Sequence, residues 1–262
     1  MDISQPGPLR NATLDLIARR RSTRTYDDAP ITPEEKQAVL HAALRAPTGG
    51  NMVLYSIIEI EDPALKERLS HTCDEQPFIA RAPWVLVFVA DWQKWTDLFE
   101  ACDAHDMPDV AHRRQAGTGD LLLACCDALI AAQTAVIAAE SLGIGSCYIG
   151  DVLENGETHA ELLGLPPHTL PIAMLCFGRP RKAQEPIGRY GTRVLHTDRY
   201  ARMTAAELSD AAGDLALLHA PNGLPEGVDN YPQAVYRRKF ASDFMHEMNR
   251  SADWWIDRWR RG

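Results

Sequence analysis

The longest apolar stretch of the chain covers residues 120–142 and is closed by Gly143 and Gly145. After Asp120, polar residues interrupt it at Asp127, Gln133, Thr134, Glu140 and Ser141. A helix of this length would span roughly 35 Å, and a helix that is hydrophobic on every face belongs in a protein interior. The interruptions leave runs well short of the ~18 consecutive apolar residues of a membrane span. The pattern therefore predicts the buried central helix of a soluble protein.

Strand-forming segments lie at residues 54–60, 84–90, 147–149 and 170–177. Residues 84–90 and 170–177 are apolar throughout, which is typical of strands that are buried on both faces. The segment at 147–149 is followed by a turn at Gly150 and Asp151, and the segment at 170–177 is closed by Gly178, as expected for strands that end in turns.

The clearest helix start is at Thr32, where Pro33 and Glu35 complete a capping box and predict a helix to about residue 45. Further helices are predicted at residues 11–19, 63–69, 157–163 and 204–219. In the first of these, Leu14 and Ile17 are expected to face inward.

We expect one α+β domain over residues 1–262, with a core at about 11–200 and a C-terminal extension at 201–262. Residues 91–118 show no clean period and are expected to cover the core irregularly. The tryptophans of the extension (Trp254, Trp255 and Trp259) predict a segment that packs on the core or on a second subunit.

The formal net charge of -9 argues against DNA or RNA as the main partner, because phosphate backbones require a surplus of Lys and Arg. It does not exclude a local basic pocket for a small phosphorylated ligand. The N-terminus lacks the basic-then-apolar pattern of a signal peptide, so a cytoplasmic location is expected. The six cysteines lie mostly in apolar segments without a CxxC pair, which predicts buried free thiols.

The most basic cluster of the chain, residues 19–24, combines several arginines with Ser22 just past a predicted helix. Guanidinium groups supply forked donors and a hydroxyl adds a neutral one, which suits a phosphate monoester. The alternative is a solvated basic face.

Two glycine-containing segments are the next candidates. In residues 48–51, Gly49 and Gly50 would let the backbone approach a flat ligand, and Asn51 offers a donor and an acceptor. The alternative is an ordinary helix-to-strand loop. The segment from Gly143 to Gly150 lacks the GxGxxG spacing of a Rossmann unit, and Tyr148 within it could equally be a core aromatic.

Two other chemistries fit poorly. The metal-ligand types at residues 102–112 (Cys102, His105, Asp106, Asp109 and His112) match no common spacing, so no metal site is predicted. A serine hydrolase would need a nucleophile elbow such as GxSxG, which the chain does not contain.

Five motifs occur in a recognisable order: RRSTRTY at residues 20–26, TGGN at 48–51, AESLGIG at 139–145, CYIG at 147–150 and LCFGRP at 175–180. Together they resemble the FMN-dependent nitroreductase family, closest to its oxygen-insensitive NADPH nitroreductase and flavin reductase branch. The resemblance covers roughly residues 11–200, and a C-terminal extension is also expected in that branch.

The resemblance implies a nitroreductase-like α+β homodimer with a central mixed or antiparallel sheet flanked by helices. The long central helix would form much of the subunit interface, with FMN bound there. It implies an enzyme in which NADPH or NADH reduces FMN by hydride transfer in a ping-pong cycle, and a small-molecule acceptor such as a nitroaromatic, a quinone or a free flavin is then reduced. Because the flavin carries the chemistry, no catalytic side chain is implied, and neither is a nucleic-acid or membrane partner.

Carried over by position, the arginine cluster would hold the FMN phosphate and ribityl chain, and a distant arginine would complete the phosphate site. The cluster contributes Arg20, Arg21, Ser22 and Arg24, and the distant residue is Arg189. In the same way, Arg238 or Arg237 falls near the position of an arginine for the NADPH phosphate.

The resemblance also assigns the residues around the flavin ring. Gly49, Gly50 and Asn51 match a loop that reaches the ring or ribityl chain from the other subunit, and Gln76 matches a flavin-contacting glutamine. The segment behind the ring is Tyr148, Ile149, Gly150 and Asp151.

The chain departs from the family pattern at Thr48, Val53, Asp151 and Ile187, where serine-rich sequence, glutamine, glycine and lysine respectively are usual. The first two changes bear on acceptor choice and flavin potential, and a carboxylate at Asp151 would disfavour an anionic reduced ring. Three alternatives stay open on these grounds: a flavin reductase that supplies reduced FMN, a specialised reductive enzyme such as a dehalogenase, and a flavin-binding module without turnover.

Overall fold

The computed structural model describes residues 8–110, 113–182, 185–186, 188–189, 191 and 194–262. The chain forms two compact units. We call Arg21–Ala183 with Glu247–Gly262 the core unit, and Met1–Arg20 with Gln184–His246 the arm unit. Each is described by itself, and the single-domain organisation of residues 1–262 stays a prediction.

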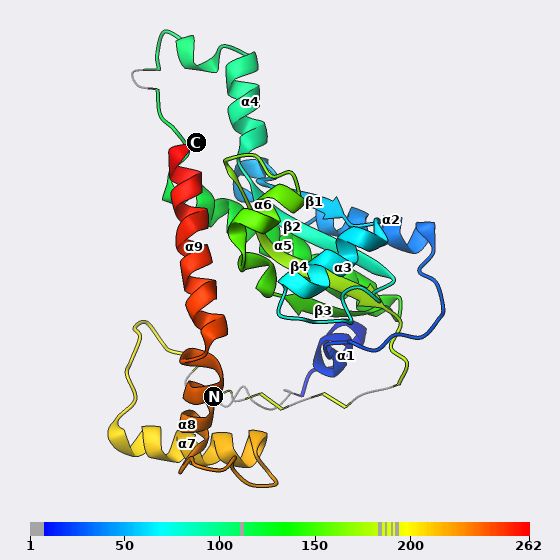
Figure 1. Cartoon of the computed structure of the whole chain (residues 1–262), viewed down its shortest axis with the longest axis vertical. Coiled ribbons are helices and arrows are strands. Elements are labelled where there is room, and N and C mark those ends of the chain that lie inside the picture. Colours follow the sequence, from blue (N-terminus) through cyan, green and yellow to red (C-terminus); the bar gives the residue numbers. More distant parts are fainter. Residues whose placement is uncertain (1–7, 111–112, 183–184, 187, 190, 192–193) are drawn as a thin grey trace. The chain divides into compact units, whose positions relative to one another are not determined.

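A four-stranded antiparallel sheet forms the centre of the core unit (Figure 1). Its order is β1 (Tyr55–Glu59), β2 (Trp84–Asp91), β4 (Thr169–Gly178) and β3 (Gly145–Ile149). Every residue of β2 is buried, and so is nearly every residue of β4. The predicted α+β class is confirmed, and the two apolar strands are buried as predicted except for the half-buried Ile172 of β4.

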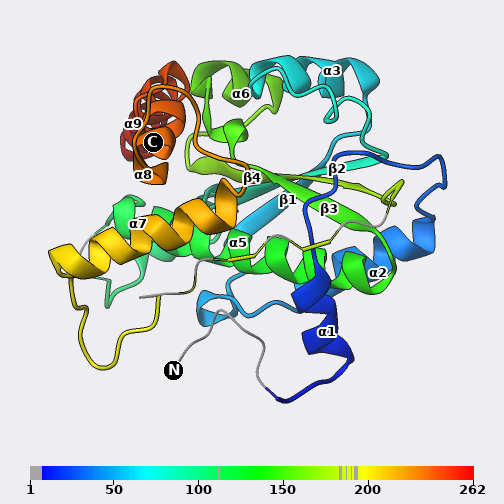
Figure 2. The ribbon, with the colours of Figure 1, turned by 90° about the horizontal axis from the view of Figure 1, so that it is seen from below.

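One face of the sheet is covered by α5 (Thr118–Ser141) and α2 (Pro33–Leu44), as Figure 2 shows. The α5 residues that meet the sheet are largely alanines, which let the helix backbone approach closely. They pack with large side chains of the strands, including Trp84, Phe88 and Phe177. The predicted capping box of α2 is present, with Thr32 and Glu35 bonded reciprocally.

The opposite face carries α3 (Pro63–Thr72), α6 (Gly156–Leu162) and α9 (Asp243–Arg261) (Figure 2). Trp255 and Trp259 of α9 are 1% exposed and belong to the same hydrophobic cluster as β2 and β4. The Nε1 of Trp255 donates to the carbonyl of Leu153 at 3.2 Å, and the Nε1 of Trp259 donates to that of Gly117 at 3.1 Å. The end of the extension therefore packs on the core of its own chain.

The remaining elements are short or belong to the arm unit. The core unit also contains α4 (Gln93–Ala101) and the 3₁₀ turns η1 (Gly49–Asn51), η2 (Ala104–Asp106) and η3 (Asp151–Leu153). The arm unit contains α1 (Ala12–Arg19), α7 (Ala205–His219), α8 (Tyr231–Val235) and the π-helical turn η4 (Tyr236–Phe240).

Three sequence expectations were wrong in detail. In α1 the buried side chain is Leu16, while Leu14 and Ile17 are exposed, because this eight-residue helix buries a narrower face than the pattern suggested. Residues 91–118 were expected to be irregular but contain α4. Cys102 and Cys126 are exposed free thiols rather than buried ones.

The central helix α5 is buried on one side. Its other side exposes large apolar residues: Leu122, Leu123, Leu129 and Ile130. Among the described residues α5 is also the one helix that is long and apolar enough to cross a membrane by length and composition, and 44% of its most apolar window is buried. A core helix meets the same criteria, so this is weak support for a membrane span.

The segment that follows the arm unit docks on the edge of the sheet beside β3. Thr23 N–H donates to the carbonyl of Ser146 at 2.9 Å, and Ser22 forms a parallel bridge with Ser146. Gly145 makes this approach possible, because a Cβ there would lie 2.8 Å from the Cβ of Thr23.

An acidic cluster joins α3, η3 and α9. Glu154 is 5% exposed, and burial together with the charges of Asp151, Asp74 and Glu247 raises its pKa to about 7. Glu247 also accepts the N–H of Asn155 at 3.1 Å, which ties α9 to the start of α6.

We predict that Gly145→Ala lowers the free energy of unfolding by about 1–3 kcal/mol, because the added methyl group overlaps Thr23. Gly119→Ala in α5 is the matched control, since its Cβ would meet no atom within 4 Å and alanine is the better helix former. Equilibrium urea unfolding measures both changes. Equal stability of the two variants would contradict the tight docking at β3.

We predict that the stabilising effect of Glu154→Gln grows from pH 5 to pH 8. Between pH 4.5 and about 7, the carboxyl of Glu154 ionises in the unfolded chain but keeps its proton in the folded chain, so wild-type stability falls as the pH rises. Glutamine removes this loss, whose upper limit is about 3 kcal/mol.

Thermal unfolding at several pH values measures the effect. Glu161→Gln, the same change at an exposed position of α6, should follow the wild type throughout. A pH-independent difference between Glu154→Gln and the wild type would rule out the raised pKa.

Candidate functional site

The arginine segment presents a cation beside β3. The guanidinium of Arg24 lies 5.7 Å from the centre of the Phe78 ring, and it forms no salt bridge with a carboxylate of the described residues. Arg21 and Ser22 are half-buried, and Thr23 is buried next to Ser146. The backbone of this segment is fixed by the sheet, and its guanidinium and hydroxyl groups are the kinds of donor that an anion such as a phosphate requires.

The other predicted phosphate ligands belong to the arm unit. Arg20 is the C-terminal cap of α1, and its N–H donates to the carbonyl of Leu16 at 3.1 Å. Arg189 is exposed. Their roles at the phosphate stay predictions, and Ile187, one of the departures from the family pattern, lies outside the described residues.

Gln76 follows α3 in a tightly turned segment. Asp74 and Glu75 both have left-handed backbone geometry, with φ of 60° and 49°. The side-chain amide of Gln76 donates to the carbonyl of Cys73 at 2.8 Å. This bond fixes the amide and leaves its oxygen as an acceptor for a ligand N–H.

Residues 150–155 adjoin this turn. The side chain of Asn155 donates to the carbonyl of Thr72 at 2.8 Å, and Asp151 is close enough to help raise the pKa of the Cys73 thiol. Burial is the larger cause of that shift. The structure therefore brings the predicted residues Gln76 and Asp151 to one corner of the core unit.

Gly150 gives this corner an open surface. A Cβ on Gly150 would meet no atom within 4 Å, so a flat group could lie against its backbone. Tyr148 is 36% exposed, and its hydroxyl donates to Gln133 of α5 at 3.4 Å. Ile149 is buried, so its backbone rather than its side chain is available to a ligand.

The loop of Gly49, Gly50 and Asn51 is exposed but firmly held. Gly49 N–H donates to the carboxylate of Asp127 on α5 at 3.0 Å, and Leu54 N–H donates to the same group at 3.2 Å. Asp127 was noted in the sequence only as an interruption of the apolar stretch. An acid in an otherwise apolar helix indicates that its carboxylate has a hydrogen-bond donor inside the protein, and this was the sequence signal for Asp127.

This loop does not lie near the arginine segment within one chain. The strands β1 and β3 are the opposite edges of the sheet, which places them roughly 14 Å apart. Ser146 is level with Trp84, whereas Tyr55, just after the loop, is level with Ala90. That offset adds about 20 Å along the strands. The predicted site residues thus form two separate groups.

The arm unit contains two neighbouring cavities. One, of about 530 Å³, is lined by Arg237 and Arg238 together with His219 and Tyr231, whose rings stack with centres 5.4 Å apart. Two guanidinium groups beside a stacked aromatic pair suit a phosphorylated nucleotide. This cavity contains Arg238, the predicted ligand of the NADPH phosphate.

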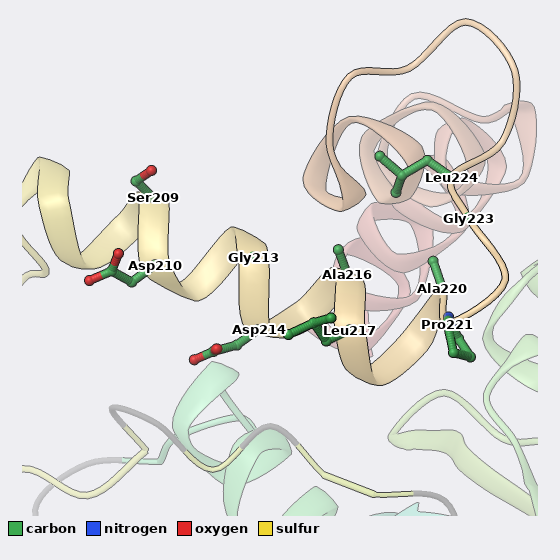
Figure 3. Close-up of a pocket in the computed structure, with 10 residues that line it drawn as sticks. All are labelled: Ser209, Asp210, Gly213, Asp214, Ala216, Leu217, Ala220, Pro221, Gly223 and Leu224. Atoms are coloured by element: carbon green, nitrogen blue, oxygen red, sulfur yellow. The ribbon is translucent and has the colours of Figure 1, made fainter.

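The second cavity, of about 630 Å³, runs along α7 (Figure 3). Apolar and small residues form most of it, and its charged side chains are the carboxylates of Asp210 and Asp214. Its charge therefore disfavours a phosphate ligand.

The candidate residues of the core unit together have the chemical groups that FMN binding requires. They provide the guanidinium of Arg24, which has no acid partner in the described chain, and the hydroxyl of Ser22. They also provide the amide oxygen of Gln76 and the open backbone of Gly150. No group of three or more His, Cys, Asp or Glu side chains in the described chain is arranged to hold a metal ion. His112 of the unmatched metal-ligand set lies outside that part.

The chain is similar in sequence to known proteins. The chain is 30% identical over 243 residues to the oxygen-insensitive NADPH nitroreductase of Salmonella typhimurium, which covers 90% of this chain and 96% of that protein. It is 34% identical over 170 residues to an FMN reductase (NADPH) of Bacillus subtilis, covering 65% of this chain and 66% of that protein.

A solved structure shows the same fold. The B. megaterium protein NfrA1 superposes with a TM-score of 0.78 at 25% identity, covering 94% of this chain and 98% of that chain. The model of the Nitroreductase family matches residues 17–179. This range includes the arginine segment, the loop at residues 49–51, Gln76 and residues 148–151. The chain belongs to the nitroreductase family, as its motifs predicted.

Proposed function

We propose that this protein is an NAD(P)H-dependent FMN oxidoreductase that reduces nitroaromatics or quinones. The observation that carries the proposal is the arginine segment, fixed to the edge of β3 next to the open backbone of Gly150. The Salmonella relative is named an NADPH nitroreductase and the Bacillus relative an FMN reductase, which agrees with this donor set. When bound, FMN accepts a hydride from the nicotinamide and passes the reducing equivalents to the acceptor.

The side chains of the core unit bind and orient. Arg21, Ser22 and Arg24 would neutralise the phosphate, with Arg20 and Arg189 as further ligands. Gln76 would accept a hydrogen bond from the ring system, and the backbone of Ile149 and Gly150 would lie behind it. Asp151 would place a negative charge near the ring and disfavour its anionic reduced form.

A homodimer would unite the two separate groups of site residues. One chain would supply the arginine segment and Gly150, and the other would supply Gly49, Gly50 and Asn51. The exposed apolar side of α5 supports this assembly, because large apolar side chains gathered on one helix face mark an interaction surface. Burial in a dimer would also account for this face without a membrane.

The electron donor would bind with its phosphate near Arg237 and Arg238. Both residues line the cavity that also contains His219 and Tyr231. A 2′-phosphate on the adenosine would pair with the arginines, which favours NADPH over NADH.

A second candidate is a flavin reductase that supplies reduced FMN to another enzyme. The exposure of Arg24, Gly50 and Asn51 favours it, since a flavin held by exposed groups exchanges readily. The relative named FMN reductase is consistent with this function.

We predict that the protein binds FMN and that NADPH bleaches the visible flavin absorbance under anaerobic conditions. Arg24→Ala should weaken FMN binding about tenfold, because a charge-assisted bond to the phosphate is lost. Arg68→Ala on the exposed face of α3 is the control and should bind FMN normally. Titration of FMN fluorescence measures both, and a wild-type protein that binds no FMN would refute the proposed function.

We predict that two damaged chains complement each other in a mixed dimer. Arg24→Ala damages the phosphate group of residues, and Gly50→Val damages the loop, since Gly50 has a φ of 59° that a β-branched residue resists. If each site takes one group from each chain, a random mixture of the two variants contains intact sites at about one quarter of the wild-type number.

The measurement is bound FMN per subunit after co-expression of the two variants. Mixing Arg24→Ala with Ser22→Ala is the control, because both changes fall in the same group and no intact site can form. A failure of Arg24→Ala and Gly50→Val to complement would show that the site lies within one chain.

A further inference from the structure

We infer that Asp127 is a positioning residue for the flavin site: it holds the loop at residues 48–54 in the geometry with which that loop meets FMN. The inference rests on the proposed function for the ligand, but the observations that support it come from the core unit alone.

Asp127 is an acid buried in an apolar environment. Its residue is 4% exposed and lies among the alanines of α5 that pack on the sheet. Burial of a carboxylate is unfavourable unless hydrogen bonds replace water. In the described chain Asp127 forms no salt bridge, and the backbone amides of Gly49 and Leu54 are its hydrogen-bond donors. Both donors belong to the loop.

The loop needs such a hold because its backbone is unfavourable. Gly50, Asn51 and Val53 all have left-handed φ angles, of 59°, 58° and 52°. Glycine and asparagine tolerate this region, but a β-branched residue does so rarely and persists there when its surroundings dictate the geometry. Local sequence preference therefore does not account for the loop conformation.

Two weaker tethers act on the middle of the same loop. The Nε1 of Trp95 on α4 donates to the carbonyl of Met52 at 2.8 Å. The N–H of Val53 donates to the Thr48 hydroxyl at 3.2 Å. Asp127 fixes the two ends of the loop, while these bonds fix its centre. The backbone is thus held at three places while Gly49, Gly50 and Asn51 stay exposed to a ligand.

The arrangement separates anchoring from ligand contact. The side chains that hold the loop are buried or half-buried, and among the residues that would meet FMN only the backbone N–H of Gly49 bonds to one of these side chains in the described structure. A loop ordered before binding loses less conformational entropy when the ligand arrives. Loss of the Asp127 carboxylate should consequently weaken FMN binding, although Asp127 lies behind the loop and would not contact FMN itself.

The test compares Asp127→Asn with Asp120→Asn in the full-length protein. Asparagine keeps the shape but turns one acceptor into a donor facing a backbone N–H. Asp120 is the matched control: it is a second buried acid of α5, 9% exposed, and it accepts the Gly117 N–H at 2.8 Å and pairs with Arg114 rather than with the loop.

FMN affinity is measured by fluorescence titration, and hydrogen–deuterium exchange is followed in a peptide covering residues 48–54 without FMN. We expect Asp127→Asn to raise the Kd for FMN about tenfold and to accelerate exchange in this peptide. Asp120→Asn should lower thermal stability without changing either quantity. If the effect of Asp127→Asn were only a general loss of stability, Asp120→Asn would change the FMN affinity and the exchange rate as well.

The inference is overturned if Asp127→Asn accelerates exchange but binds FMN with wild-type affinity, because Asp127 would then be purely structural. A wild type that binds no FMN would instead overturn the proposed function itself. Should Asp127→Asn not fold, Thr48→Val serves as the milder variant, since it removes only the acceptor of the Val53 N–H. It should raise the Kd for FMN several-fold, and an unchanged Kd would count against the positioning role.

Discussion

Helix α5 is apolar on every side, and the sheet covers only part of its surface. Its alanines let the helix lie close to Trp84 and Phe177, whose rings are in contact with centres 4.9 Å apart. Burial of that face is the main stabilising contribution on this side of the sheet. The exposed side, with Leu122, Leu129 and Ile130, has no comparable cover within the described chain. In the proposed homodimer, the partner subunit would cover this exposed apolar side of α5.

The antiparallel sheet explains why a second subunit would also matter for the site. Its order places β1 and β3 at opposite edges, and the chain enters those edges through different segments. The loop before β1 is anchored to α5 through Asp127, and the arginine segment is anchored to β3 through Thr23. Each group is rigid by itself, and a single sheet keeps them apart. The same helix that anchors the loop presents the apolar face, so dimer formation and completion of the site would be one event.

Much of this could be predicted from the sequence. The buried strands, the capping box at Thr32 and the length of α5 follow from short-range patterns and were confirmed. The division of α5 into covered and exposed faces could not be predicted, because apolar residues lie on all its sides and its few polar residues do not mark one face. Helix α4 was missed because its N-terminus lacks a side-chain cap and its aromatic residues are mixed with polar ones.

The site divides in the same way. The arginine segment and Gly150 were predicted from motifs of consecutive residues, and Gln76 was predicted from its position in the family resemblance. The contact between Gly49 and Asp127 joins residues 78 positions apart, and no local rule indicates such a pair. The left-handed angle at Val53 is likewise imposed by long-range tethers. The types of residue proposed for the site could be read from the sequence, but the long-range contacts that hold those residues in place could not.

The acidic cluster beside Gly150 bears on how the site would be tuned. Asp151 lies next to the open backbone, and Glu154 shares its surroundings with Asp74 and Glu247. Because the pKa of Glu154 is raised to about 7, the negative charge of this corner increases as the pH passes through neutrality. A reduced flavin gains negative charge, so each added carboxylate nearby disfavours it and makes it a stronger reductant. The family's usual glycine at position 151 would lack that charge. In the proposed site, the departure at Asp151 would therefore act on the driving force for transfer to the acceptor, whereas the arginine segment would act on binding.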